Sequence, residues 1–300
     1  MLIFRFLLRH LAAYALLGAA CVSATGLAAE LSVNRLTVAL QPDKDPDRML
    51  EERASLEKYL ETGLGVPVRV VIPMSSAVII EGFANGSIDV AYLSSTDALR
   101  AMEDGAGSIV LAGEIDGKTH YNSYWVTLKD KPYESVEDLR GKRIAFSSRT
   151  STSGYMIPVW DLYKKDLITA EEGPDGFFGS GNVTYGVGYV SAVEHVLRGS
   201  AEAAAVSDYV LDKDRHLRPE QREQLRMLAK QGPVPTHTIS VRSNLAPEDR
   251  QALERGLLEM NEKKPELRDK VFTSRLVVVD PEEHVRVTRE AFDLIKRMRF

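Results

Sequence analysis

The sequence contains a single cysteine and no excess of basic residues. With Cys21 alone, a disulfide framework, a cysteine-ligated zinc site and a thiol-redox motif are excluded. Lys and Arg number 38 against 43 Asp and Glu, so the formal net charge is −5, and no Lys/Arg-rich run occurs. This balance argues against a protein that binds nucleic acid non-specifically.

Long apolar runs are also missing, and the rest of the composition is that of a globular protein. Hydrophobic residues make up 44% of the chain and charged residues 27%, which excludes a disordered, collagen-like or polytopic membrane protein. A length of 300 residues exceeds that of one small domain. We therefore expect one large domain or two lobes.

The N-terminus is typical of an export signal rather than of a folded segment. Arg5 and Arg9 form a positive region, and a short apolar stretch followed by small residues leads to Ala29. The apolar stretch is too short for a comfortable membrane span, although a retained anchor is the alternative. We predict a signal peptide over residues 1–29 and a periplasmic location.

Cleavage near Ala29 would change the length and the net charge of the chain. The signal carries two arginines and no acid, so 36 basic residues remain against 43 acidic ones in 271 residues, a net charge of −7. The mature chain has no thiol and cannot use thiol catalysis. The segment 17–21 also resembles a lipoprotein signal, with Gly18 where leucine is preferred, so a lipid anchor at Cys21 is an alternative.

Beyond the signal, strand patterns alternate with helical ones. The predicted strands are 36–40, 66–72, 88–93, 142–147, 182–187 and 203–206. The predicted helices are 48–62, 76–85, 153–165, 191–197, 219–228, 247–260 and 282–298. Strands separated by helices predict an α/β fold with mostly parallel sheets flanked by helices.

Two stretches of the chain echo each other. Residues 76–95 and 191–208 each contain a Ser-Ala-Val helix start, a Gly-Ser pair, an acid three residues after the glycine, an apolar strand and a hydroxyl at the strand end. The echo indicates two similar lobes, or else a coincidence between two ordinary helix–strand units. Ligands of open α/β sheets sit at the carboxyl ends of strands. The candidate cleft residues are therefore Ser94, Ser95, Ser207 and Asp208.

A cluster of hydroxyls marks a candidate anion site. The predicted strand 142–147 leads into Ser147–Gly154, in which seven of eight residues are hydroxylic or glycine, and a helix then begins. A helix N-terminus leaves N–H groups unpaired and carries partial positive charge, which favours an anion. The alternative is simple helix capping by Ser151 or Thr152. A nucleotide P-loop is excluded because no Gly-Lys-Ser/Thr follows at the required spacing.

Several segments of the sequence resemble those of a known family. The segments that carry the resemblance are Tyr121–Val126, Ser135–Lys142, Ser151–Tyr155 with Pro158, and Gly86–Tyr92. They are similar to the phosphate/phosphite/phosphonate (PhnD-type) substrate-binding proteins of ABC importers, over roughly residues 34–260. The resemblance implies a two-lobed type II periplasmic binding protein fold. It places lobe 1 at 30–120 and 238–300, lobe 2 at 121–237, and crossovers near 114–123 and 232–239.

The resemblance also gives residues roles. Ser151, Thr152 and Ser153 would hold an oxyanion at the helix start, and Tyr121 would reach the same group through its hydroxyl. Ser94, Ser95 and Thr96 would contribute from the first lobe. The implied ligand is a small oxyanion, namely phosphate, phosphite or a phosphonate, and the implied partner is the membrane permease of an ABC importer.

The chain departs from the family around the residues that would hold the oxyanion, which we call the oxyanion seat. Where members often carry Ser-His-Asp, it has Tyr189-Val190-Ser191, and an aspartate that members often carry later is Ser207, with Asp208 one place on. A tyrosine of the first lobe is replaced near 75–77. An amine needs correctly placed carboxylates, so aminoalkyl phosphonates are in doubt, and a ligand such as a sulfonate stays open.

Other classes of function are weighed against this one. The mature chain has no cysteine to hold a tetrapyrrole and no Gly-x-Ser-x-Gly elbow, and we expect no enzyme activity and no cofactor. The sequence shows no set of metal-ligating side chains at a known spacing, so we expect no metal. We expect a monomer that does not bind nucleic acid. A periplasmic sensor that reports its ligand to a membrane receptor or kinase is the alternative to an importer subunit.

Overall fold

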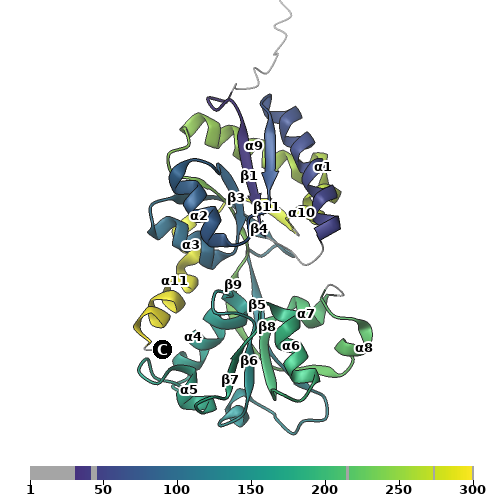
Figure 1. The fold of residues 1–300 in the computed structure, drawn as a ribbon, viewed down its shortest axis with the longest axis vertical. Helices are drawn as coiled ribbons and strands as arrows, with labels where there is room; N and C mark the ends of the chain where they lie inside the picture. Colours follow the sequence, from purple (N-terminus) through teal and green to yellow (C-terminus); the bar gives the residue numbers. More distant parts are fainter. Residues whose placement is uncertain (1–30, 42–45, 214–215, 273, 299–300) are drawn as a thin grey trace, which may run out of the picture.

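The computed structural model describes residues 31–41, 46–213, 216–272 and 274–298. They form two lobes, one above the other in Figure 1, each with a β-sheet flanked by helices. The two-lobed α/β architecture predicted from the sequence is confirmed. The predicted signal peptide, 1–29, and the alternative lipid anchor at Cys21 lie outside the described residues.

The sheet of the first lobe has six strands. In chain order they are β1 (Leu36–Leu40), β2 (Val68–Val71), β3 (Val90–Leu93), β4 (Gly107–Glu114), β10 (Thr238–Arg242) and β11 (Arg275–Val277). Their order in the sheet is β11-β4-β10-β3-β1-β2. β1 pairs in parallel with β2 and β3, whereas β10 runs antiparallel to both β3 and β4, and β11 antiparallel to β4.

The sheet of the second lobe has five strands and a matching plan. They are β5 (His120–Leu128), β6 (Ile144–Phe146), β7 (Val183–Tyr185), β8 (Ala203–Ser207) and β9 (Leu225–Pro235), in the order β7-β6-β8-β5-β9. β6 pairs in parallel with β7 and β8, and β5 runs antiparallel to β8 and β9. β3 and β8, the strands of the sequence echo, thus hold equivalent places, each between a parallel and an antiparallel neighbour.

Both sheets are mixed, which corrects the expectation of mostly parallel sheets. The alternation of strands and helices predicted the parallel part of each sheet, around β1 and β6. The antiparallel part comes from strands next to the passages between lobes: β5 and β9 in one sheet, β4 and β10 in the other. Their direction depends on where the chain enters a sheet, and a local pattern does not encode that.

Helices cover both faces of each sheet. The first lobe has α1 (Pro46–Leu64), α2 (Ser76–Asn85), α3 (Ser95–Glu103), α9 (Pro247–Lys263) and α10 (Pro265–Val271). The second has the 3-10 helix η1 (Val136–Leu139), the π-helix η2 (Thr152–Met156), α4 (Ile157–Lys164), α5 (Gly173–Phe178), α6 (Tyr189–Leu197), α7 (Tyr209–Asp212) and α8 (Pro219–Arg222). The helix predicted at 219–228 ends at Arg222. The prediction is wrong beyond that point because Leu225 and Leu228 are buried in β9, which pairs with β5.

The chain passes from the first sheet to the second at 115–119 and returns at 236–237. The last helix, α11 (Pro281–Arg297), packs against α3 of the first lobe and against α4 and β9 of the second, and it spans the waist at the left of Figure 1. One buried apolar cluster accordingly runs from Phe83 in the first lobe through Val285 of α11 to Phe146 in the second. We keep 30–120 with 238–300, and 121–237, as our proposal for the two lobes, with α11 shared between them.

Candidate functional site

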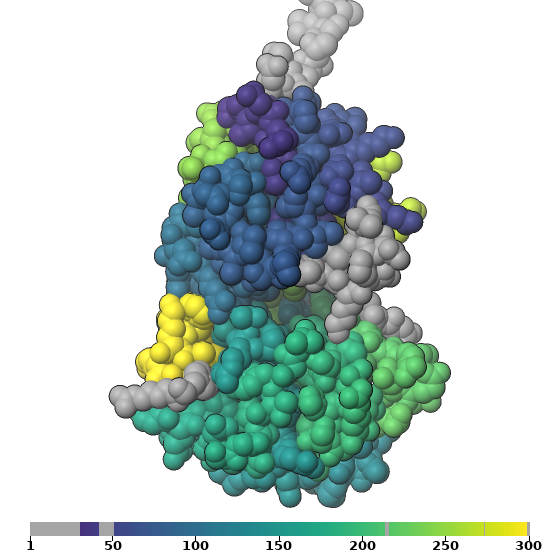
Figure 2. All heavy atoms as spheres, in the orientation of Figure 1, coloured from purple at the N-terminus to yellow at the C-terminus, as the bar shows by residue number. Residues whose placement is uncertain are grey.

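A cavity of about 440 Å³ lies between the two lobes. Leu40 and Tyr92 line it at the carboxyl ends of β1 and β3, and Ser147 lines it just after β6. In Figure 2 the waist between the lobes is hollowed. The carboxyl ends of parallel strands from both sheets therefore meet at one cavity, which is where open α/β sheets bind ligands.

The start of α3 forms the first-lobe wall of this cavity. Ser94 caps the helix: its Oγ accepts from the Asp97 backbone N–H at 3.2 Å and donates to Asp97 Oδ2 at 2.8 Å. Ser94 and Asp97 line the cavity, whereas Ser95 and Thr96, predicted beside Ser94, are buried at 1% and 0% exposure and do not. The N-terminal end of a nine-residue helix, where backbone N–H groups lack partners within the helix, thus lies at the cavity.

The start of η2 forms the opposite wall. Ser151 caps it, accepting from the Gly154 N–H at 3.0 Å, so the capping role considered for this residue is real. Ser151 and Thr152 also line the cavity, and α4 follows η2 without a break. A Cβ at Gly154 would lie 2.4 Å from Ser147 Oγ, so glycine here allows the turn to lie against the end of β6.

Hydroxyls of the two lobes meet behind the cavity. Thr96 Oγ1 lies 2.8 Å from Thr152 Oγ1, and Ser95 Oγ donates to the same atom at 3.4 Å. On the other side, Thr288 of α11 donates to Ser95 Oγ at 3.2 Å. The structure therefore brings together the two sets of hydroxyl-bearing residues that the sequence predicted on separate lobes. Helix α11 belongs to the same hydrogen-bond network.

Two tyrosines complete the lower wall. Tyr121 donates to Ser153 Oγ at 3.3 Å, and the Tyr189 hydroxyl lies 2.6 Å from the same oxygen. Burial raises the pKa of both phenols, so both stay protonated and can donate. Ser153 is fully buried beneath them and does not line the cavity, whereas Tyr121 and Tyr189 do. Tyr189 begins α6, which makes a third helix N-terminus at this cavity.

Ser207 and Asp208, the remaining predicted site residues, do not line the cavity. Ser207 is fully buried at the end of β8. Asp208 accepts from the backbone N–H of Asn122 at 2.9 Å and from its Nδ2 at 3.3 Å. Burial raises the pKa of Asp208. In this structure the pair ties β8 to β5, while Ser94, the counterpart of Ser207 in the echo, reaches the cavity.

Sequence reasoning missed several cavity residues. Asp97 follows the capping Ser94 by three residues, and its oxygens also accept from Gln41 Nε2 and Ser76 Oγ, each at 2.9 Å. The capping pattern was a signal that could have found Asp97. His237 lies on the return passage between the lobes, and burial lowers its pKa to about 4. No local pattern marks it, because the passage itself brings it to the cavity.

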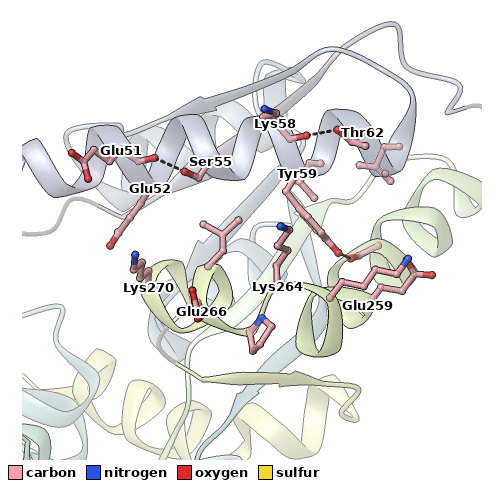
Figure 3. Close-up of a pocket in the computed structure, with 17 residues that line it drawn as sticks. Glu51, Glu52, Ser55, Lys58, Tyr59, Thr62, Glu259, Lys264, Glu266 and Lys270 are labelled. Carbon is pink, nitrogen blue, oxygen red and sulfur yellow. Dashed lines mark hydrogen bonds and ion pairs between the residues drawn. The ribbon is translucent and has the colours of Figure 1, made fainter.

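A second and larger hollow, of about 1070 Å³, lies on the flank of the first lobe between α1, α9 and α10. Figure 3 shows Tyr59 reaching across it to the backbone of α9, where its hydroxyl donates to the Gly256 carbonyl at 2.9 Å. Its walls mix lysines with glutamates, and no predicted site residue lines it. Glu52 and Lys270 line both hollows, so the flank opens towards the interlobe cavity there.

The described part of the chain offers neither a cluster of metal-ligating side chains nor a membrane-spanning helix. No group of three or more His, Cys, Asp or Glu side chains among those residues could hold a metal ion. Within the same residues, no helix is long and apolar enough to cross a membrane.

A two-lobed α/β fold with a cavity between the lobes defines the class of periplasmic binding proteins. The family model for "ABC transporter, phosphonate, periplasmic substrate-binding protein" matches residues 38–284. The chain belongs to this family, as the resemblance in the sequence predicted. Its members are substrate-binding transport proteins rather than enzymes. Membership implies an exported, periplasmic location.

Individual relatives agree with the family. The chain is 28% identical over 193 residues to the phosphonates-binding periplasmic protein of Escherichia coli (strain K12), covering 62% of this chain and 54% of the relative. It is 25% identical over 209 residues to the phosphate-import protein PhnD of Mycolicibacterium smegmatis (strain ATCC 700084 / mc(2)155), covering 67% and 65%. The matches thus span about half to two thirds of these two relatives.

A solved structure shows the same fold. PhnD1 from Prochlorococcus marinus (MIT 9301), in complex with methylphosphonate, superposes with a TM-score of 0.72 at 18% identity. The match covers 88% of this chain and 99% of that one. The likeness extends over both lobes and supports the type II binding-protein architecture.

Proposed function

We propose that this protein is the periplasmic solute-binding component of an ABC importer and captures a phosphorus oxyanion, namely phosphate, phosphite or a phosphonate, between its lobes. It would act as a non-catalytic carrier that delivers its ligand to a membrane permease. The single observation that carries the proposal is the meeting of three helix N-termini, those of α3, η2 and α6, at the interlobe cavity.

The physical argument is one of short-range donors. Each helix start offers unpaired N–H groups and partial positive charge, and Ser151 and Thr152 add hydroxyls at the same cavity. The hydroxyls of Ser94, Tyr121 and Tyr189 also lie there, and they would exchange their bonds to Asp97 and Ser153 for bonds to the ligand. Hydrogen bonds to an ionised group are the strong ones, so such a seat favours an oxyanion. The net negative charge of the chain does not oppose this, because distant charges are screened while the donors act in contact.

Closure of the lobes would complete the donor shell. Donors of the first lobe surround α3 and those of the second surround η2 and α6, so neither lobe holds the full set. A ligand that binds both walls favours the closed arrangement by its differential affinity. The permease would then distinguish the closed, loaded protein from the open, empty one.

A thermal-shift panel tests the proposal. Protein purified from the periplasm would be unfolded and refolded to remove carried ligand, then mixed with phosphate, phosphite, methylphosphonate, 2-aminoethylphosphonate, sulfate or an alkylsulfonate. A ligand at one hundred times its Kd adds about 2.7 kcal/mol of stability. A shift with a phosphorus oxyanion and none with sulfate is expected. A shift with the sulfonate alone, or no binding of any phosphorus oxyanion, phenylphosphonate and phenyl phosphate included, would overturn the proposal.

A further inference from the structure

The interlobe cavity is larger than an inorganic oxyanion requires. Its volume is about 440 Å³, whereas one water molecule occupies about 30 Å³ of liquid and a tetrahedral oxyanion has only five non-hydrogen atoms. Cavities of roughly 300–1,000 Å³ are typical of organic ligands. A phosphorus oxyanion at the helix N-termini therefore leaves most of the cavity for a substituent.

The wall formed by Tyr92 of the first lobe and His237 of the return passage is aromatic and held in place. Tyr92 and His237 both line the cavity and stack on each other, with ring centroids 5.1 Å apart and planes 30° apart. Tyr92 is fixed at its far end, where its hydroxyl donates to the Phe272 carbonyl at 2.7 Å. Because that hydroxyl is used, Tyr92 presents its ring to the cavity rather than a polar group.

The second-lobe wall carries rings as well. Tyr121 and Tyr209 stack with centroids 5.2 Å apart and planes only 18° apart, and Tyr189 meets His216 edge-on at 5.8 Å. All four line the cavity. Among the described residues, six rings thus face this space, three pairs from the two lobes. Aromatic rings favour flat partners through offset or edge-to-face packing, worth about 0.5–1.5 kcal/mol a pair beyond area burial.

The carboxylates near the seat are already engaged. Asp97 is 5% exposed and accepts from Ser94, Gln41 and Ser76. A new cation would have to displace these donors. Asp208 does not line the cavity. Glu52 also lines the cavity, together with Lys270, at the end where the cavity meets the flank hollow. The walls around the ring pairs thus offer rings for a flat group, and Asp97, the carboxylate that follows the cap of α3, is already engaged.

Resting on the proposed function, we propose that the natural ligand is a phosphonate or phosphate monoester whose substituent is a flat, uncharged aromatic or heteroaromatic group. The oxyanion sits at the starts of α3, η2 and α6. The substituent lies between the ring pair formed by Tyr92 of the first lobe and His237 of the return passage, on one side, and the rings of the second lobe on the other. Lobe closure brings the two aromatic walls onto its faces.

Calorimetry on ligand-stripped protein tests this with matched probes. Phenylphosphonate and phenyl phosphate are the aromatic arms and separate the two oxyanion sources. Methylphosphonate and 2-aminoethylphosphonate are the small arms. Cyclohexylphosphonate controls for size without flatness. At least one aromatic arm is expected to bind ten or more times tighter than methylphosphonate and at least three times tighter than cyclohexylphosphonate.

Variants show whether the rings cause the preference. In Tyr92→Leu and His237→Leu the ratio of phenylphosphonate to methylphosphonate affinity should fall at least threefold, and Tyr92→Phe should retain it. Tyr59→Leu, which alters a tyrosine of the flank hollow, is the control and should leave the ratio unchanged. A second readout is the absorption band of p-nitrophenylphosphonate, which should shift on binding to the unaltered protein and shift less with Tyr92→Leu.

The outcomes separate the two proposals. If methylphosphonate, 2-aminoethylphosphonate or cyclohexylphosphonate binds as tightly as the aromatic arms, the aromatic-ligand inference fails and the proposed function stands. If the aromatic preference is present but insensitive to Tyr92→Leu and His237→Leu, the assigned walls are wrong and the inference fails. If no phosphorus oxyanion binds, the proposed function itself is overturned.

Discussion

Thr96 and Thr152 join the two lobes through their hydroxyls, whose oxygens lie 2.8 Å apart. Thr96 is the second residue of α3 and Thr152 the first residue of η2, so the contact links two helix N-termini across the waist. Both threonines are buried, at 0% and 4% exposure. Because the two threonines belong to different lobes, this contact of the proposed binding site forms only when the lobes hold this position relative to each other.

Thr96→Val should weaken ligand binding about fivefold. Valine keeps the shape of threonine but removes the hydrogen bond to Thr152, which is worth about 1 kcal/mol to the arrangement in which the lobes touch. Calorimetry with the ligand found in the panel measures the change. Thr62→Val on α1, whose hydroxyl donates to the Lys58 carbonyl of the same helix at 2.8 Å, is the matched control. Equal affinities for both variants would mean that the contact is no part of closure.

Replacing Thr152 and Ser153 together by alanine should weaken oxyanion binding tenfold or more. The variant removes the hydroxyl of Thr152 from the cavity and the oxygen that positions Tyr121 and Tyr189, and hydrogen bonds to a charged group are worth roughly 1.5 kcal/mol or more. Ser55→Ala on the exposed face of α1 serves as the control. Unchanged affinity in calorimetry would refute this placement of the site.

Gly154→Ala should lower the free energy of unfolding by about 1–3 kcal/mol, because a Cβ there would lie 2.4 Å from Ser147 and 2.8 Å from Ser151 Oγ. Urea unfolding measures the loss. Gly63→Ala is the control, since nothing lies within 4 Å of a Cβ at that helical position, and there alanine should be neutral or stabilising by up to about 1 kcal/mol. A loss no larger at Gly154 than at Gly63 would show that the turn relaxes freely.

His237 should make the fold less stable in acid. Its pKa in the folded protein is about 4, lowered from 6.5 by burial. Between these pH values the unfolded chain binds a proton at His237 that the folded protein does not. The contribution of this group to the free energy of unfolding is therefore most favourable above pH 6.5. It falls by about 1.4 kcal/mol for each pH unit as the pH decreases from 6.5 to 4.

Urea unfolding between pH 7 and pH 4 measures the acid sensitivity of His237. His237→Gln should lose less stability over this range than the unaltered protein, and His195→Gln is the control. Parallel stability curves for the unaltered protein and His237→Gln would show that His237 titrates alike in both states.

Much of the site could be predicted from local sequence. Ser151 and Thr152 stand at the end of a strand and the start of a helix, and Ser94 stands at an equivalent junction, so each lies at a strand's carboxyl end whatever the rest of the fold. The echo between β3 and β8 was equally local and proved to mark equivalent strands. The echo also predicted that Ser207 faces the cleft, whereas it is buried and does not line the cavity. Whether a side chain at a strand end faces the cavity or packs inside depends on its neighbours in the fold.

By itself the sequence determined the α/β class, the parallel strands around β1 and β6, and the helix starts that offer N–H groups and hydroxyls. These follow from periodicity and capping, which act over a few residues. Only the tertiary structure decided the antiparallel strands, the helix α11 shared by both lobes, and the meeting of Tyr92, His237 and Tyr189 at one cavity. Those residues come together through the two passages between the lobes, and contacts between distant segments leave no local pattern.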